Sequence, residues 1–327
     1  MKPASFVLVV VSLALMLTGC RGGETPTTVA PPPSPPTNTS PPPATPTPTP
    51  VPPTFTPTLS PLSPSNLPAD PQRVEFQNAD GLTLVGYYYP SRYAHAPVIV
   101  LMHWARGDKR DWCKIAPWLQ NRSDESPAEM PGCSQVTAAA AYARWWDDSW
   151  FPPLPDETSY AVFAFDFAGA GESEGPQYGA TPQDVLAALQ TVATLEGVDA
   201  SRILAAGASF GADGGPDGCL LYQQAGGKCL GAFSWSPGSF LGMRYASVIA
   251  DLTAFEPPVL VWCLAAENEA HDRSTCESAS DHLARTFVFA GTDAHGMDLI
   301  TPELTVGEPA KNSLELFLDF LAETLGE

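Results

Sequence analysis

Basic residues are scarce in this sequence. Its 327 residues include 16 Lys and Arg against 36 Asp and Glu, which gives a formal net charge of −20. A chain this acidic repels nucleic acid and anionic lipid, and no basic helix or RNA-binding motif offsets the charge. The patterns C-x-x-C and H-E-x-x-H are also absent, which argues against a structural zinc site. We expect no nucleic-acid partner, no metal and no cofactor.

The N-terminus carries a short apolar run, Phe6 to Leu17, after the basic Lys2. This run is shorter than the ~20 residues that cross a bilayer. It ends in Leu17-Thr-Gly-Cys20, a small-residue cleavage site closed by a cysteine. The segment resembles a bacterial lipoprotein signal. That resemblance implies removal of residues 1–19, a lipid on Cys20, and anchoring to an envelope membrane on its extracytoplasmic side. The alternative is an ordinary secretion signal that is cut elsewhere.

Proline and threonine dominate residues 20–69. Half of the 36 prolines lie between Arg21 and Pro68, with almost no large apolar residue. Because such a segment has little to bury in a core, we expect a disordered, partly polyproline II linker. At ~3.1 Å per residue it would hold a domain up to roughly 150 Å from a membrane.

The cysteines other than Cys20 fall into three neighbouring pairs. An exported protein meets oxidising conditions, and short loops favour local bridges, so we expect disulfide bonds within the pairs. The alternative is buried free thiols. The pairs are Cys113 with Cys133, Cys219 with Cys229, and Cys263 with Cys276.

Residues 70–327 alternate between strand-like and helix-like patterns, which predicts one large α/β domain. Strands are expected at 73–78, 82–89, 97–103, 160–165, 201–208, 230–235, 258–265 and 286–290. Helices are expected at 108–120, 134–146, 181–195, after residue 209, and at 240–252, 274–284 and 314–325. This order indicates a mainly parallel eight-stranded sheet with helices on both faces. In such sheets the ligand site lies at the carboxyl ends of the strands.

Residues 121–159 interrupt this rhythm after the first helix. They are rich in proline, and six of the eight tryptophans lie between Trp104 and Trp150. We expect an insertion near the mouth of the ligand site. Its aromatic residues would either form a wall for the substrate or supply extra core for a cap.

The segment Gly207-Ala-Ser-Phe-Gly211 follows a strand pattern and precedes small residues that can begin a helix. A G-x-S-x-G pattern in this context is typical of a nucleophile elbow, in which Ser209 would be lifted clear of the sheet. The alternative is a small-residue turn with an ordinary hydroxyl. A serine nucleophile needs a base and an acid that orients the base. We expect His295 as the base and Glu267 as the acid, in the chain order Ser, acid, His.

Other assignments remain open around these residues. Glu269 is the second choice for the acid. Other histidines fit the base less well: His95 precedes a core strand, and His271 and His282 lie in or near a predicted helix. Glu267 and His271 could instead share a helical face as metal ligands.

From about Gln72 onward, the chain resembles the α/β-hydrolase superfamily, and most of all its dienelactone-hydrolase-like esterase branch. The resemblance is carried by the elbow and by four further segments: His103-Trp-Ala-Arg-Gly107 with Asp111-Trp112, Asp166 to Gly175, Pro258 to Glu267, and Ala294-His295-Gly296. Two positions depart from the family, which often has glycine at Trp104 and aspartate at Glu267.

The resemblance implies two backbone N–H donors for an oxyanion. One belongs to Phe210 and the other to Trp104, or to Ala105 if the loop is shifted. We expect a structural role for His103 within its loop, and for Asp213 at the start of the next helix. A tight turn below the site is expected from Asp166, Gly169, Gly171 and Ser173.

These residues indicate a serine hydrolase that cleaves an ester or similar acyl bond of a small molecule through an acyl-enzyme. A peptidase or amidase on the same scaffold is one alternative, because the triad does not separate the two bonds. A non-catalytic surface module that binds through the tryptophan-rich insertion is the other. The oligomeric state stays open.

Overall fold

The computed structural model describes residues 63–134, 147–280 and 284–326, which belong to one compact unit. The signal segment, Cys20 and the linker up to residue 62 lie outside the described residues, as does nearly all of the helix expected at 134–146. Within the described ranges, no helix is both long and apolar enough to cross a membrane. Residues just before the expected domain start already pack on it, since Pro64 pairs with Tyr93 and Leu67 lies against the core.

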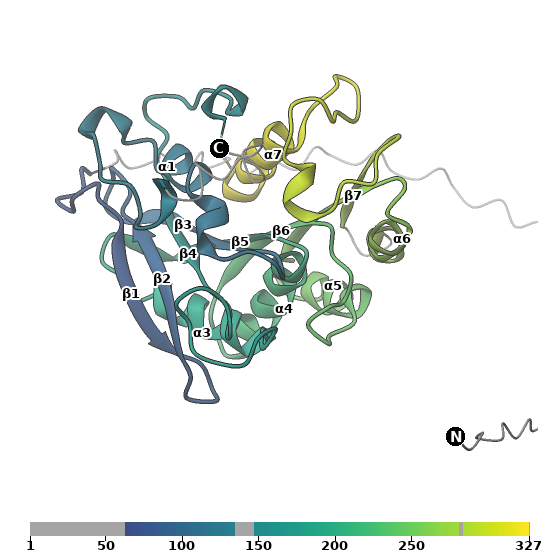
Figure 1. Cartoon of the computed structure of the whole chain (residues 1–327), viewed down its shortest axis with the longest axis horizontal. Helices are drawn as coiled ribbons and strands as arrows, with labels where there is room; N and C mark the ends of the chain where they lie inside the picture. Colours follow the sequence, from purple (N-terminus) through teal and green to yellow (C-terminus); the bar gives the residue numbers. More distant parts are fainter. Residues whose placement is uncertain (1–62, 135–146, 281–283, 327) are drawn as a thin grey trace, which may run out of the picture. The chain divides into compact units, whose positions relative to one another are not determined.

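The eight expected strands form one sheet in the order β1-β2-β4-β3-β5-β6-β7-β8 (Figure 1). The first two strands pair antiparallel with each other, β2 pairs antiparallel with β4, and the remaining pairs are parallel. The predicted mainly parallel sheet is therefore confirmed. Its strands are β1 Gln72–Gln77, β2 Thr83–Tyr89, β3 Ala96–Met102, β4 Ala161–Phe165, β5 Val198–Ala208, β6 Cys229–Trp235, β7 Leu260–Ala266 and β8 Arg285–Phe289.

Helices cover both faces of the sheet, as expected (Figure 1). The alternation along β3 shows the two layers: Val98 and Val100 pack with α3, α4, α5 and α6, whereas Ile99 and Leu101 pack with α1 and α7. Both faces of β3 are buried, which explains its continuous apolar run. The helices are α1 Ile115–Gln120, α3 Pro182–Val192, α4 Phe210–Gln224, α5 Tyr245–Thr253, α6 Ala270–Ala279 and α7 Ser313–Leu325.

Three helix starts differ from the sequence prediction. The helix expected at 108–120 is split into a 3-10 turn at Lys109–Trp112 followed by α1. Helix α5 begins five residues later than expected, whereas α6 begins four residues earlier. The shift of α6 changes which acidic residue faces the site.

All three predicted disulfide bonds are present. Each joins Cα atoms 5.4–5.6 Å apart, within the usual range for a disulfide. Cys219–Cys229 ties α4 to β6, and Cys263–Cys276 ties β7 to α6. The bridges thus clamp the helices that follow the central strands to the sheet.

Candidate active site

Ser209 lies on the sharp turn between β5 and α4. Its backbone has φ 52° and ψ −108°, a conformation that L-residues seldom adopt, and its N–H donates to the Trp235 carbonyl at 2.8 Å. A Cβ added to Gly207 would overlap the backbone of Gly211, and one added to Gly211 would overlap the carbonyl of Met102. The elbow therefore requires both glycines of the motif for close packing of strand and helix.

A chain of two hydrogen bonds runs from the elbow into the C-terminal loops. The Ser209 Oγ lies 2.8 Å from His295 Nε2, and His295 Nδ1 lies 2.6 Å from Asp272 Oδ2. The carboxylate of Asp272 is 1 % exposed. With Asp272 accepting from Nδ1–H, the lone pair of Nε2 faces the serine hydroxyl, which is the arrangement of a nucleophile with its base and orienting acid.

The carboxylate that contacts His295 is not the one that the sequence predicted. Glu267 is exposed, and its carboxylate accepts the N–H of Gly291 at 2.8 Å instead of contacting His295. It follows directly on the end of β7, and the turn from there to α6 directs it toward the loop after β8. The second choice, Glu269, has a carboxylate oxygen within 4.8 Å of ligand atoms of Asp272 and His295, but no hydrogen bond joins it to the imidazole.

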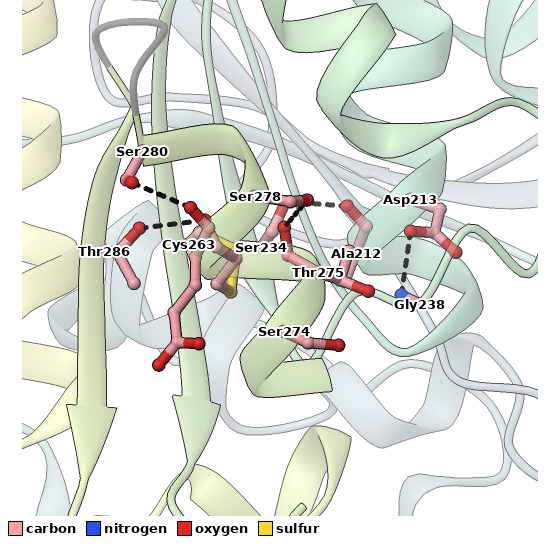
Figure 2. The surroundings of a disulfide bond; sticks show 12 residues. Ala212, Asp213, Ser234, Gly238, Cys263, Ser274, Thr275, Ser278, Ser280 and Thr286 are labelled. Carbon is pink, nitrogen blue, oxygen red and sulfur yellow. Dashed lines mark hydrogen bonds between the residues drawn. A yellow bond between two sulfur atoms is a disulfide. The ribbon is translucent and has the colours of Figure 1, made fainter. Parts of the chain in front are cut away.

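Helix α6 explains why Asp272 occupies the acid position. The helix starts at Ala270, so Asp272 falls in its first turn, where the helix dipole favours a negative charge. The Cys263–Cys276 disulfide fixes α6 to β7, and the Thr286 hydroxyl of β8 donates to the Cys276 carbonyl at 3.2 Å (Figure 2). A helix begun at residue 274, as predicted, would leave Asp272 in a loop. An acidic residue two positions inside a helix that follows the penultimate strand is the signal that sequence reasoning missed.

The electrostatics of His295 suit a general base. The hydrogen bond that His295 donates to Asp272 raises the pKa of His295 above its ordinary value, and the negative charges of Asp272, Glu269 and Asp298 act in the same direction. Burial opposes this shift. The N–H of the next residue, Gly296, donates to the Ser236 hydroxyl at 2.9 Å, which anchors the histidine loop to the end of β6.

The alternative metal pair, Glu267 and His271, does not come together. Among the described residues, the His, Cys, Asp and Glu side chains close enough to share an ion are Glu269, Asp272 and His295. His271 instead contacts the Gly238 carbonyl through Nε2 at 2.9 Å. Since both ring nitrogens of His295 are engaged by Asp272 and Ser209, an ion at this cluster would have to displace the hydrogen-bond chain.

The loop after β3 is held by buried polar contacts. His103 accepts the Phe167 N–H at Nε2, 3.1 Å away, and its Nδ1 lies 2.6 Å from the Trp104 carbonyl. Burial lowers the pKa of His103, so a neutral ring with the proton on Nδ1 fits both contacts. Asp166 accepts both the backbone N–H and the ammonium of Lys109, at 2.7 and 2.5 Å. These contacts match the structural roles expected of His103 and Asp166, and they join the β3 and β4 loops rigidly.

Asp213 serves a different element from the one predicted. It lies inside α4, but its carboxylate accepts the backbone N–H groups of Gly238, Ser239 and Phe240 instead of capping its own helix (Figure 2 shows the Gly238 contact). Burial raises the pKa of Asp213 to about 7. The side chain therefore holds the loop between β6 and α5, from which the Phe240 ring meets His295 edge-on with centroids 6.1 Å apart.

A hollow of about 260 Å³ opens beside the elbow. Its wall includes Ala105, Arg106 and Phe210, and its far side is formed by the segment that precedes α3. Trp150 of the insertion does not line it, and neither do two tryptophans that precede the insertion: Trp112 is fully buried, and Trp118 stacks on Phe151 elsewhere. Extra core thus describes these two tryptophans better than a substrate wall, while residues 145 and 146 lie outside the described part of the chain.

One tryptophan does lie near the nucleophile. A Cβ added to Gly296 would lie 3.1 Å from the Trp104 ring and 3.6 Å from the Cβ of Ser209. The Trp104 side chain therefore packs against the histidine loop beside the elbow. The indole at this position therefore packs beside Ser209.

Comparison with known proteins gives matches by structure alone. A scan of protein-family models and a search of curated proteins both returned no match. Among solved structures, the chain is similar to the alpha/beta hydrolase GrgF from Penicillium sp. sh18, with 13 % identity, a TM-score of 0.50, and coverage of 79 % of this chain and 99 % of that one.

Two further solved structures have lower TM-scores. One is the carboxylesterase EstE1 from a metagenomic library, with 16 % identity, a TM-score of 0.45, and coverage of 80 % and 91 %. The other is Est1E from Butyrivibrio proteoclasticus, with 12 % identity, a TM-score of 0.48, and coverage of 77 % and 98 %. With the strand order and the elbow already described, the comparison with GrgF shows that this chain has the α/β-hydrolase fold.

Proposed function

We propose that the protein is a serine hydrolase that cleaves carboxylic esters through an acyl-enzyme. One observation supports this above the others: the unbroken hydrogen-bond chain from Ser209 through His295 to Asp272 at the carboxyl edge of the sheet. A buried serine in a strained turn, a base with a raised pKa and a buried carboxylate are together what acyl transfer requires. The triad acid in this proposal is Asp272, in place of the predicted Glu267.

In the proposed reaction, the Ser209 oxygen attacks the ester carbonyl while His295 Nε2 takes its proton. The resulting imidazolium is stabilised by Asp272. The oxyanion would accept the N–H of Phe210, which as the first residue of α4 has no partner within the helix, and the N–H of Trp104 or Ala105. His295 then protonates the leaving alcohol. A water molecule, deprotonated by His295, hydrolyses the acyl-serine and restores the enzyme.

Active-site labelling tests this proposal. A fluorophosphonate probe should label the folded wild-type protein and should not label Ser209→Ala. A parallel panel of phenyl esters and anilides of the same acids separates an esterase from an amidase. An unlabelled wild-type protein, shown to be folded by circular dichroism, would overturn the proposal, and turnover of anilides alone would reassign the bond.

The placement of the enzyme is a second part of the proposal. We propose that Cys20 carries a lipid that anchors the protein to the cell envelope, with the domain held outside by residues 20–69. Three disulfide bonds in the described residues support an oxidising location. Within the superfamily we place the chain in the dienelactone-hydrolase-like esterase branch. Metabolic labelling with a fatty acid should mark the wild type and not Cys20→Ser, and equal labelling of both would refute the anchor.

A further inference from the structure

Arg106 differs from the other cations of its loop. Lys109 and Arg110 both form ion pairs with carboxylates, at 2.5 Å from Asp166 and 2.5 Å from Asp108. Across the described residues, most Lys and Arg side chains are paired in this way, but Arg106 is exposed and forms no ion pair there. Among the described residues, Lys228 and Arg244 are likewise exposed without an ion pair. In a chain with a net charge of −20, each of the three leaves an unbalanced positive charge, and Arg106 does so at a place that the other two do not share.

That place is the hollow beside the elbow. Arg106 lines it together with Gln177 and Tyr178, which supply an amide and a phenol, while Phe167 and Phe210 add apolar surface. Tyr178 is 60 % exposed and has a φ of 60°, an unusual backbone conformation for a tyrosine. The positive φ belongs to the turn that the Gly179 N–H closes on the Pro176 carbonyl at 2.8 Å, and this turn leaves the exposed phenol at the wall of the hollow.

The hollow lies on the acyl side of the proposed reaction. Ala105 and Phe210, two of the candidate donors for the oxyanion, belong to its wall. Neither Ser209 nor His295 lines it, so the hollow adjoins the reacting serine only through these donor residues, whereas His295 must face the leaving alcohol in order to protonate it. A substrate whose carbonyl sits between the donors and Ser209 therefore directs its acyl chain into the hollow and its alcohol toward His295.

We propose that this hollow binds a carboxylate at the far end of the acyl chain, and that Arg106 determines this specificity by pairing with it. The substrate class is then the monoesters of dicarboxylic acids. The inference rests on the proposed ester hydrolysis at Ser209. The pairing is a charge-assisted hydrogen bond, for which a planar guanidinium is well suited. Because the overall charge of the protein repels anions, selection for such an ester needs a local cation.

The experiment compares two phenyl esters that differ only at the end of the acyl chain: phenyl hexanoate and the phenyl monoester of adipic acid. The measured quantity is the ratio of kcat/KM for the adipate monoester to kcat/KM for the hexanoate, at low salt. We expect Arg106→Gln to lower this ratio about tenfold and Arg106→Lys to lower it less, because lysine keeps the charge but loses the planar fork. Added salt should lower the wild-type ratio as well, since Arg106 is exposed.

The matched control is Lys228→Gln. Lys228 is also exposed and forms no ion pair in the described part of the chain, but it precedes β6 at the edge of the sheet opposite the site. Lys228→Gln removes the same charge away from the site, so the ratio of the two kcat/KM values should equal that of the wild type. An unchanged ratio in Arg106→Gln, or an equal drop in Lys228→Gln, would overturn the inference while ester hydrolysis stands. A folded wild-type protein that shows neither esterase activity nor fluorophosphonate labelling would instead refute the proposed function itself.

Discussion

Replacement of Asp272 by asparagine tests the geometry of the proposed triad at a single atom. The exchange keeps the shape of a side chain that is 1 % exposed but removes its charge. In the wild type, that charge faces the imidazolium that forms in the transition state, across a contact of 2.6 Å between Oδ2 and Nδ1. Two unit charges roughly 4 Å apart at an effective dielectric of about 20 interact by about 4 kcal/mol. Asp272→Asn should therefore lower kcat/KM by about 10³-fold.

Glu267→Gln is the matched control for this substitution. It removes the same charge from the residue that the sequence favoured, but that carboxylate binds the Gly291 N–H and does not reach His295. Its kcat/KM for phenyl hexanoate should stay within about threefold of the wild type. Thermal melting by circular dichroism shows whether each variant is folded. Equal losses in both variants, or an Asp272→Asn enzyme that keeps more than about a tenth of the activity, would refute the assignment of the acid.

The pH profile gives an independent reading of the same contact. Asp272 raises the pKa of His295 above its ordinary value of 6.5, and the base must be neutral to accept the serine proton. Activity should therefore fall as the pH drops through a value above 6.5. In Asp272→Asn, the residual activity should fall only at a lower pH, because the charge that raises the pKa of His295 is gone. If activity falls at the same pH in the variant and in the wild type, Asp272 does not raise the pKa of His295.

Three further predictions concern stability, and urea or thermal unfolding measures each of them. Gly211→Ala should lower the free energy of unfolding by roughly 3 kcal/mol, because the added Cβ overlaps the Met102 carbonyl; an unchanged midpoint would show that the elbow can relax. Asp217 is buried and has no hydrogen-bond partner among the described residues, and burial raises its pKa to about 8. The folded protein therefore holds a proton that the unfolded chain releases above about pH 4, and stability falls between roughly pH 4 and 8, by on the order of 5 kcal/mol. Asp217→Asn should flatten this slope, and an identical slope in the variant would disprove the role of Asp217. Replacement of Cys263 and Cys276 by alanine should cost about 3 kcal/mol for a loop of this length, and should lower activity because α6 carries the acid; full stability with full activity would contradict this.

Much of the fold could be predicted from the sequence because its signals are local. The continuous apolar run of β3 needs only burial on both faces, and the small residues around Ser209 are explained by one tight turn. The position of His295 beside Ser209 was predictable as well, since His295 follows the last strand at the edge where parallel strands end. These inferences depend on periodicity and chain order, which the sequence contains directly.

The acid could not be placed in the same way. The choice between Glu267, Glu269 and Asp272 depends on where α6 begins and how it turns, within six residues that all lie near the end of β7. Local propensity did not predict a helix start at Ala270, whereas the Cys263–Cys276 bridge and the contact of Thr286 with the helix hold it in place. Those are long-range contacts. A similar limit applies to Asp213, whose three backbone partners lie 25 or more positions further along the chain.

Helix α4 shows how the rigidity of the elbow arises from tertiary contacts. Its sequence, FGADGGPDGCLLYQQ, is a weak helix former, because each internal glycine costs about 1 kcal/mol relative to alanine and Pro216 removes one backbone donor. The donor lost at Pro216 would have bonded the Ala212 carbonyl, and the Ser234 hydroxyl of β6 occupies that position at 2.6 Å (Figure 2). The Gly218 position allows α3 to approach, since a Cβ there would overlap Val185. A helix that is poor on its own is thus stabilised by the strand and the helix on either side of it. The strain at Ser209 persists because these neighbours, and not the helix itself, hold the turn.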